Sequence, residues 1–332
     1  MGEKKIRAAV IGCGGFGRNL YLPILKSLAA YETVAAADIN LEAARKCAEE
    51  FKLRYATDDP ERVFADPEVD AVFIATRHDS HVPLSIRAAR AGKHILCEKP
   101  MGVNWEECLQ LADEVRRSGV RYSIGYNRGL APLVVKAREL LADQAARRLI
   151  YHRIQAPFPE RHWIHDPVAG GGRLVGEGCH IFDLLCELVP APPVTVYACG
   201  GTFLDPKLVA TPDSAIVTIG FADGSVGTTI VASAGCGRFP KEATEIYCAG
   251  RAIHINDFRE LGYYGFLENG DGRIQLDAVD KGHRREVALF AAALLEGGPQ
   301  PNGLEQALRA ARISFLAGES IRTGQVLPVT GL

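Results

Sequence analysis

Three glycines near the start of the chain have a spacing that suits a phosphate-binding turn. Gly12, Gly14 and Gly17 form the pattern G-x-G-x-x-G directly after an apolar run. In such a turn one glycine allows the tight bend, one lets the backbone approach a pyrophosphate, and one lets the next helix pack closely. The helix N-terminus then faces the phosphates with its free N–H groups. The predicted cofactor loop comprises Gly12, Cys13, Gly14, Gly15, Phe16 and Gly17.

An acidic residue ends the next apolar run, at the spacing from the glycines that is typical of a ribose-binding carboxylate. Asp38 ends the run 33–38 and lies 21 residues after Gly17. A carboxylate there accepts hydrogen bonds from the adenosine ribose hydroxyls and would repel a 2′-phosphate. No arginine follows it directly, because the next residues are Ile39 and Asn40. The predicted cofactor is therefore NAD(H), with NADP(H) disfavoured.

Two further groups of residues could perform chemistry. Lys99 lies in Glu98-Lys99-Pro100, directly after a short apolar segment, where its amine could reach a cofactor or a substrate. Pro100 biases Lys99 toward an extended conformation. His180 and Asp183 are three residues apart, so on a helix their imidazole and carboxylate would share one face and could address one pocket.

The elements that must position these groups alternate along the first 125 residues. Apolar runs predict strands at 6–11, 33–38, 71–75 and 94–97, and helical spacing predicts helices at 19–30, 41–51, 60–65 and 82–91. Strands that alternate with helices pair in parallel through right-handed crossovers. We therefore expect an α/β Rossmann domain, doubly wound around a mostly parallel sheet, over residues 1–125.

The second part of the chain has a different pattern. A helix is predicted at 133–141, and strands at 149–155, 215–221, 226–233, 244–249 and 252–256, separated by turn signals. We expect residues 126–332 to form an α+β domain with a large, mainly antiparallel open sheet. Such a sheet can leave one face free for a partner or a second subunit.

Composition narrows the classes of partner. The 332 residues include 38 Lys and Arg against 40 Asp and Glu, so no basic excess points to nucleic acid or an anionic membrane. No stretch reaches the roughly 18 to 20 apolar residues that span a bilayer. Nine cysteines without a C-x-x-C pair favour reduced thiols and a cytoplasmic protein. His162 and His165 lack a completing carboxylate or thiolate, so no metal is expected.

These motifs together resemble the Gfo/Idh/MocA family of oxidoreductases, named after glucose-fructose oxidoreductase and inositol dehydrogenase. The resemblance rests on the glycine loop, Asp38, the runs 74–81 and 91–100, and the glycine-rich segment 170–185. It implies a nicotinamide-dependent dehydrogenase that acts on a secondary alcohol of a sugar or cyclitol, and it suggests a homodimer or homotetramer.

The resemblance also assigns residues to roles. It implies that Lys99 lies by the nicotinamide and the substrate hydroxyl, and that His180 is the catalytic acid or base. The expected cofactor contacts further include Ala75, Thr76, His81, Glu98 and Lys99. The expected substrate contacts are Lys99, Arg128, Trp163, Glu177, His180 and Asp183, with a packing role for Trp163 as the alternative.

The chain departs from the family pattern at one position. Many members have an aspartate four residues before the histidine, where this chain has Gly176 with Glu177 beside it. On a helix Glu177 points about 100° away from position 176, so the aspartate's role is not transferred to it. Two other functions stay open: an NAD-dependent glycoside hydrolase that works by transient oxidation and elimination, and a non-catalytic NAD-binding regulator, against which the presence of both Lys99 and His180 speaks.

Overall fold

The computed structural model describes residues 4–142, 146–266 and 270–331, and the chain divides into two compact units. The first unit comprises residues 1–125 and 284–308, and the second comprises 126–283 and 309–332. The sequence had suggested that everything after residue 125 belongs to the second domain. Residues 284–308 return to the first unit because Val287, Phe290 and Ala291 pack into its hydrophobic core.

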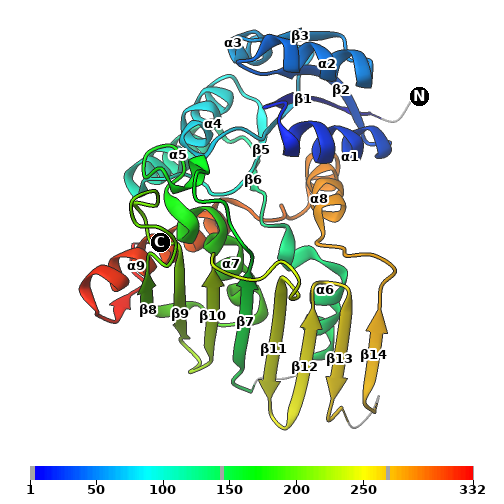
Figure 1. Ribbon diagram of the computed structural model, residues 1–332. Helices are drawn as coiled ribbons and strands as arrows, with labels where there is room; N and C mark the ends of the chain where they lie inside the picture. Colours follow the sequence, from blue (N-terminus) through cyan, green and yellow to red (C-terminus); the bar gives the residue numbers. More distant parts are fainter. Residues whose placement is uncertain (1–3, 143–145, 267–269, 332) are drawn as a thin grey trace. The chain divides into compact units, whose positions relative to one another are not determined.

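The first unit contains a six-stranded parallel sheet in the order β3-β2-β1-β4-β5-β6 (Figure 1). Its strands are β1 (Ile6–Ile11), β2 (Tyr31–Ala37), β3 (Tyr55–Thr57), β4 (Ala71–Ile74), β5 (His94–Cys97) and β6 (Tyr122–Ile124). Its α-helices are α1 (Leu22–Ser27), α2 (Leu41–Phe51), α3 (Pro60–Phe64), α4 (His81–Arg90), α5 (Trp105–Ser118) and α8 (His283–Glu296), with a π-helix η1 (Gly17–Tyr21) and a 3-10 turn η2 (His78–Ser80). The order reverses beside β1, the switch point where doubly wound sheets bind their ligands.

The second unit contains a nine-stranded sheet in the order β14-β13-β12-β11-β7-β10-β9-β8-β15 (Figure 1). Its strands are β7 (Leu149–Gln155), β8 (Pro193–Gly201), β9 (Ser214–Phe221), β10 (Val226–Ala232), β11 (Glu242–Cys248), β12 (Arg251–Asn256), β13 (Glu260–Tyr264), β14 (Gly272–Gln275) and β15 (Leu327–Pro328). Among the described strand pairs of this second sheet, only the pair of β7 and β10 is parallel. The sheet is therefore mixed but mainly antiparallel.

Helices cover one face of this second sheet. They are α6 (Pro132–Leu140), α7 (Cys179–Leu188) and α9 (Leu304–Thr323), and three short turns, η3 (Asn127–Leu130), η4 (Trp163–His165) and the π-helix η5 (Leu174–Gly178), precede or join them. Their apolar side chains form one core with the inward residues of the strands, as the alternating burial of β9 illustrates. The α/β and α+β fold classes expected from the sequence are confirmed.

Candidate active site

The glycine loop joins β1 to η1, and two of its glycines are required by close backbone packing. Gly12 has φ +99°, and a Cβ on it would lie 2.4 Å from the Ala75 carbonyl oxygen. A Cβ on Gly17 would lie 1.8 Å from the Gly12 carbonyl oxygen. By contrast, Gly14 and Gly15 face open space and are exposed. The loop therefore offers bare backbone that a pyrophosphate can approach, which fits a dinucleotide.

Asp38 holds this loop from the end of β2. Its Oδ2 accepts a hydrogen bond of 2.7 Å from the Cys13 backbone N–H, and its Oδ1 accepts one of 2.8 Å from the Asn40 N–H. The carboxylate is partly exposed, and each oxygen has a second lone pair for a ribose hydroxyl. Cys13 itself is buried, and burial raises the pKa of its thiol far above the usual range. The loop thus presents an uncharged thiol beside the acidic group.

The loop after β4 closes against β1. The Ala75 N–H donates to the Ile11 carbonyl at 2.7 Å, and the partly exposed Thr76 accepts at its Oγ1 a hydrogen bond of 2.7 Å from Ser80 Oγ. His81 is completely buried, with Nδ1 2.8 Å from the Pro100 carbonyl oxygen and Nε2 3.3 Å from that of Thr76. Burial lowers the pKa of His81. Its imidazole therefore joins the loops that follow β4 and β5, rather than lying at the surface.

The Glu-Lys-Pro motif follows β5, and its two charged side chains differ in exposure. Glu98 is buried, and its Oε1 accepts a hydrogen bond of 2.6 Å from the hydroxyl of Tyr21 in η1. Burial raises the pKa of Tyr21, so the tyrosine stays a neutral donor. Lys99 is partly exposed, and the peptide bond between Lys99 and Pro100 is cis. Glu98 therefore fixes the strand end from which Lys99 emerges.

His180 lies in the first turn of α7, directly after the π-helix η5. It is buried to 5% exposure, and its ring contacts that of Tyr126 edge-on, with centroids 6.0 Å apart. Asp183 is also on α7 but is completely buried, with Oδ1 4.0 Å from Nη2 of Arg309. The predicted helix that carries both residues is present. Their catalytic and substrate-binding roles stay predictions.

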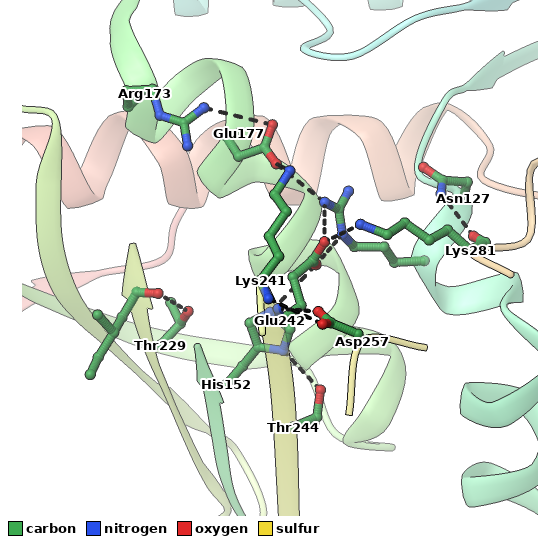
Figure 2. Close-up of polar contacts among 12 residues, drawn as sticks. Asn127, His152, Arg173, Glu177, Thr229, Lys241, Glu242, Thr244, Asp257 and Lys281 are labelled. Carbon is green, nitrogen blue, oxygen red and sulfur yellow. Dashed lines mark hydrogen bonds and ion pairs between the residues drawn. The ribbon is translucent and has the colours of Figure 1, made fainter. Parts of the chain in front are cut away.

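A network of buried charges lies beside the start of this helix (Figure 2). Glu242 of β11 is 1% exposed and accepts hydrogen bonds from Arg128, at 2.7 Å from Nε and 3.0 Å from Nη2. The ammonium of Lys281 contacts the same carboxylate. Burial alone would raise the pKa of Glu242, but Arg128 and Lys281 outweigh it and hold the pKa well below its usual value. Arg128 Nη2 also reaches Glu177 Oε1 at 3.2 Å.

One histidine in this network is uncharged near neutral pH. His152 of β7 is completely buried, with Nδ1 2.8 Å from Thr244 Oγ1 and Nε2 3.8 Å from Glu242 Oε2. Burial lowers the pKa of His152 to about 4 despite the neighbouring carboxylate. The imidazole is therefore neutral and serves as a polar packing residue.

Trp163, which the sequence analysis placed among the substrate contacts, lies in the loop after β7 with several other aromatic residues. The Phe158 ring contacts His162 and His165 edge-on, with centroids 5.1 and 5.4 Å apart. Trp163 is partly exposed and packs against His162 at 5.3 Å. Within the described parts of the chain, no group of three His, Cys, Asp or Glu side chains could hold a metal ion. The two histidines are thus part of an aromatic cluster.

Sequence reasoning missed most of the charged network. It singled out Arg128 and Glu177 but not Glu242, Lys241, Lys281 or His152. A signal was available for Glu242, which occupies an inward position of a strand that alternates between buried and exposed residues. An acidic residue at such a position is almost always paired. Lys281 lies in a loop and carried no comparable signal.

Comparison with known proteins decides the family. A family profile described as "Oxidoreductase family, NAD-binding Rossmann fold" matches residues 6–126, and the "GFO/IDH/MocA C-terminal domain" matches residues 134–254. The chain belongs to the Gfo/Idh/MocA family. Members of this family are NAD-dependent oxidoreductases, so the expected enzyme class and the expected cofactor NAD are confirmed.

Curated relatives cover between two thirds and nearly all of the chain. The uncharacterized oxidoreductase YrbE of Bacillus subtilis is 24% identical over 98% of this chain and 97% of its own length. Myo-inositol 2-dehydrogenase of Thermotoga maritima is 26% identical over 67% of each chain. A solved levoglucosan dehydrogenase in complex with NADH and levoglucosan superposes with a TM-score of 0.89, at 23% identity over 99% of this chain and all of the other. The described residues include no helix long and apolar enough to cross a membrane.

Proposed function

We propose that the enzyme oxidises a secondary alcohol of a sugar, sugar derivative or cyclitol with NAD, or reduces the corresponding ketone. Relatives named for inositols and for levoglucosan support a substrate with several hydroxyls. The observation that carries the proposal is the pair of side chains that the family pattern assigns to chemistry: Lys99 emerges from a strand end fixed by Glu98, and His180 lies in the first turn of α7.

Each side chain has a defined part in the proposed reaction. NAD, when bound, supplies the two-electron oxidation of the carbinol carbon. His180 accepts the hydroxyl proton at an imidazole nitrogen, and Lys99 donates a hydrogen bond to the oxygen as negative charge develops on it. The C–H and O–H bonds break and the C=O bond forms. In the reverse direction His180 returns the proton.

The test is a screen of inositols, hexoses, amino sugars and sugar nucleotides, with NAD and NADP compared side by side. On the substrate found, Lys99→Ala and His180→Ala should each lower kcat by about 10²- to 10⁴-fold, the usual contribution of a positioned acid or base. Binding of NADH, followed by fluorescence, should stay close to wild type. Lys46→Ala, an exposed position on α2, is the matched control. Near-normal turnover in both site variants would refute the assignment.

We further propose that the enzyme forms a homodimer or homotetramer through the outer face of the nine-stranded sheet. Tyr197, Ile216 and Tyr247 point outward from this face and are 41%, 50% and 46% exposed. Large apolar side chains gathered on one surface are typical of interaction sites. Light scattering after size exclusion should report an oligomer that Ile216→Lys weakens. A wild-type monomer would refute this proposal.

A further inference from the structure

One arginine of the second unit is buried without the acceptors that a buried guanidinium requires. Arg173 precedes η5 and is 2% exposed. Among the described residues, the only hydrogen bond of its side chain runs from Nε to Ser233 Oγ, at 3.1 Å. The guanidinium lies over the Phe158 ring, 4.1 Å from its centroid. The four N–H groups on Nη1 and Nη2 therefore have no hydrogen-bond acceptor within the described chain.

The nearest carboxylate does not satisfy these donors. Glu177 Oε2 lies 3.9 Å from Arg173 Nη1, which is an ionic contact but too long for a hydrogen bond. Asp213 attracts Arg173 more weakly, and its oxygens accept hydrogen bonds from the backbone of Phe203 and Leu204 and from Ser214. Burial lowers the pKa of Arg173, in contrast to Arg128, whose carboxylate partners raise its pKa despite burial.

A second cation lies on the other side of the same carboxylate. Lys241 Nζ is 3.8 Å from Glu177 Oε1, and Figure 2 shows Arg173 and Lys241 approaching different oxygens of Glu177. The Lys241 side chain is 47% exposed, and its ammonium makes no hydrogen bond to a described residue. Asp257, the other acid beside Lys241, accepts from the backbone N–H groups of residues 241 and 242. An incoming anion would therefore find one buried and one accessible cation.

The position of these cations relates them to the proposed catalytic histidine. Glu177, which both cations face, precedes His180 by three residues on a continuous run of helix. Residues three apart on a helix are neighbours on its surface. A small molecule bound to Arg173 and Lys241 would accordingly extend toward the turn that carries His180. Phe158 lies against Arg173, His162 packs against Phe158, and Trp163 packs against His162. Aromatic side chains of this kind suit the carbon face of a sugar ring.

We propose that the substrate carries an anionic oxygen group, a carboxylate or a phosphate, that binds Arg173 through Nη1 and Nη2 and Lys241 through Nζ. The planar fork of an arginine matches two oxygens of such a group and adds charge-assisted hydrogen bonds. The proposal rests on the proposed function, because it names the class of sugar or cyclitol derivative that the enzyme takes. Sugar acids and sugar phosphates are the two classes that present this chemistry.

The experiment compares matched ligands on the full-length protein. D-Glucuronate, D-galacturonate and glucose 6-phosphate are compared with D-glucose and myo-inositol, by calorimetry in the presence of NADH and by NADH formation in the presence of NAD. We expect the anionic compounds to bind more tightly, and the preference to fall as salt is added. The acid and phosphate arms separate the two possible anions. If none of the three anionic compounds binds more tightly than glucose, the proposal is overturned.

Two variants distinguish a ligand-binding arginine from a structural one. Arg173→Met should weaken binding of the anionic ligand by about 10- to 100-fold, the usual value of hydrogen bonds to a charged group. It should leave the melting temperature unchanged or raised, because it removes a buried charge that lacks acceptors. Arg173→Lys keeps the charge and should recover only part of the affinity. Arg322→Met, exposed on α9, is the control with the same charge change.

The outcomes separate this inference from the proposed function. If neutral polyols are oxidised but anions show no Arg173-dependent preference, the inference is wrong and the dehydrogenase proposal stands. If no compound reduces NAD but glucuronate or glucose 6-phosphate binds in an Arg173-dependent manner, the anion-binding inference stands and the dehydrogenase proposal is wrong. A lowered melting temperature in Arg173→Met together with unchanged ligand preference would assign Arg173 a purely structural role and overturn the inference.

Discussion

Replacing Glu242 by glutamine removes the negative charge at the centre of the buried network without changing the size of the side chain. Wild-type Glu242 binds Arg128 through two hydrogen bonds, of 2.7 and 3.0 Å, and also contacts Lys281. Glutamine keeps one oxygen acceptor but leaves Arg128 with a single carboxylate contact, to Glu177 at 3.2 Å. Breaking a buried ion pair by removing one partner costs about 3–5 kcal/mol. We expect a loss of this size in the free energy of unfolding of the second unit.

The assay must report on the second unit alone, because a chain of two units need not unfold in one step. The chain has two tryptophans, Trp105 in the first unit and Trp163 in the second. In a Trp105→Phe background, the fluorescence of Trp163 during urea unfolding therefore follows the second unit. Glu139→Gln, an exposed partner of Lys136, is the matched control and should leave the urea midpoint in place.

The pH dependence of stability provides a second measurement of the effect of the Glu242 charge. The pKa of Glu242 is lower in the folded than in the unfolded state, so its contribution to stability is complete above the unfolded pKa of about 4.3 and declines as the pH falls below it. The loss caused by Glu242→Gln should thus be largest near neutral pH and shrink in acid. Combining it with Arg128→Met should cost less than the sum of the single changes. An unchanged urea midpoint in Glu242→Gln would contradict the reasoning.

Three further predictions concern the first unit. Gly12→Ala should abolish NADH binding, measured by fluorescence titration, because its Cβ would overlap the carbonyl oxygen of residue 75. Gly14 faces open space, so Gly14→Ala should bind NADH better than Gly12→Ala. Asp38→Ala should lower the ratio of kcat/KM for NAD to that for NADP, because it removes the charge that repels a 2′-phosphate; an unchanged ratio would count against Asp38. Tyr21→Phe should leave Glu98 without its 2.6 Å donor and cost about 1–3 kcal/mol in thermal unfolding, with kcat reduced more than the affinity for NADH.

Sequence patterns predicted several regular elements well, although the long helices α5, α8 and α9 and the long strand β8 were not predicted. The strands at 6–11, 94–97 and 149–155 and the helix at 41–51 have the expected bounds, because each combines a clear period with strong boundary signals. The three-residue strands β3 and β6 were missed, since so short a segment has no measurable period. The helix expected over 19–30 begins earlier, as the π-helix η1, a backbone form that side-chain spacing does not encode.

Some residues of the candidate site could be predicted from sequence because their partners are close along the chain, and others could not because their partners are far away. The glycine loop and Asp38 could be found from sequence because their contacts join consecutive elements of one β-α-β unit. The partners of Arg128 could not be found, because Glu242 is 114 residues away along the chain and approaches only when β11 pairs with β7. A single sequence contains the inward-facing charge but not the identity of its partner.

The structure also bears on the carboxylate that the family pattern leads one to expect at Gly176. Glu177 is adjacent in sequence, yet its oxygens face Arg128, Arg173 and Lys241, at 3.2, 3.9 and 3.8 Å. Both carboxylate oxygens of Glu177 are therefore directed at cations. Glu177 is therefore better suited to holding cations beside His180 than to replacing the missing aspartate. Position 176 thus carries no carboxylate, while Arg173 and Lys241 place two cations beside the neighbouring Glu177, an arrangement that suits the anionic substrate proposed above.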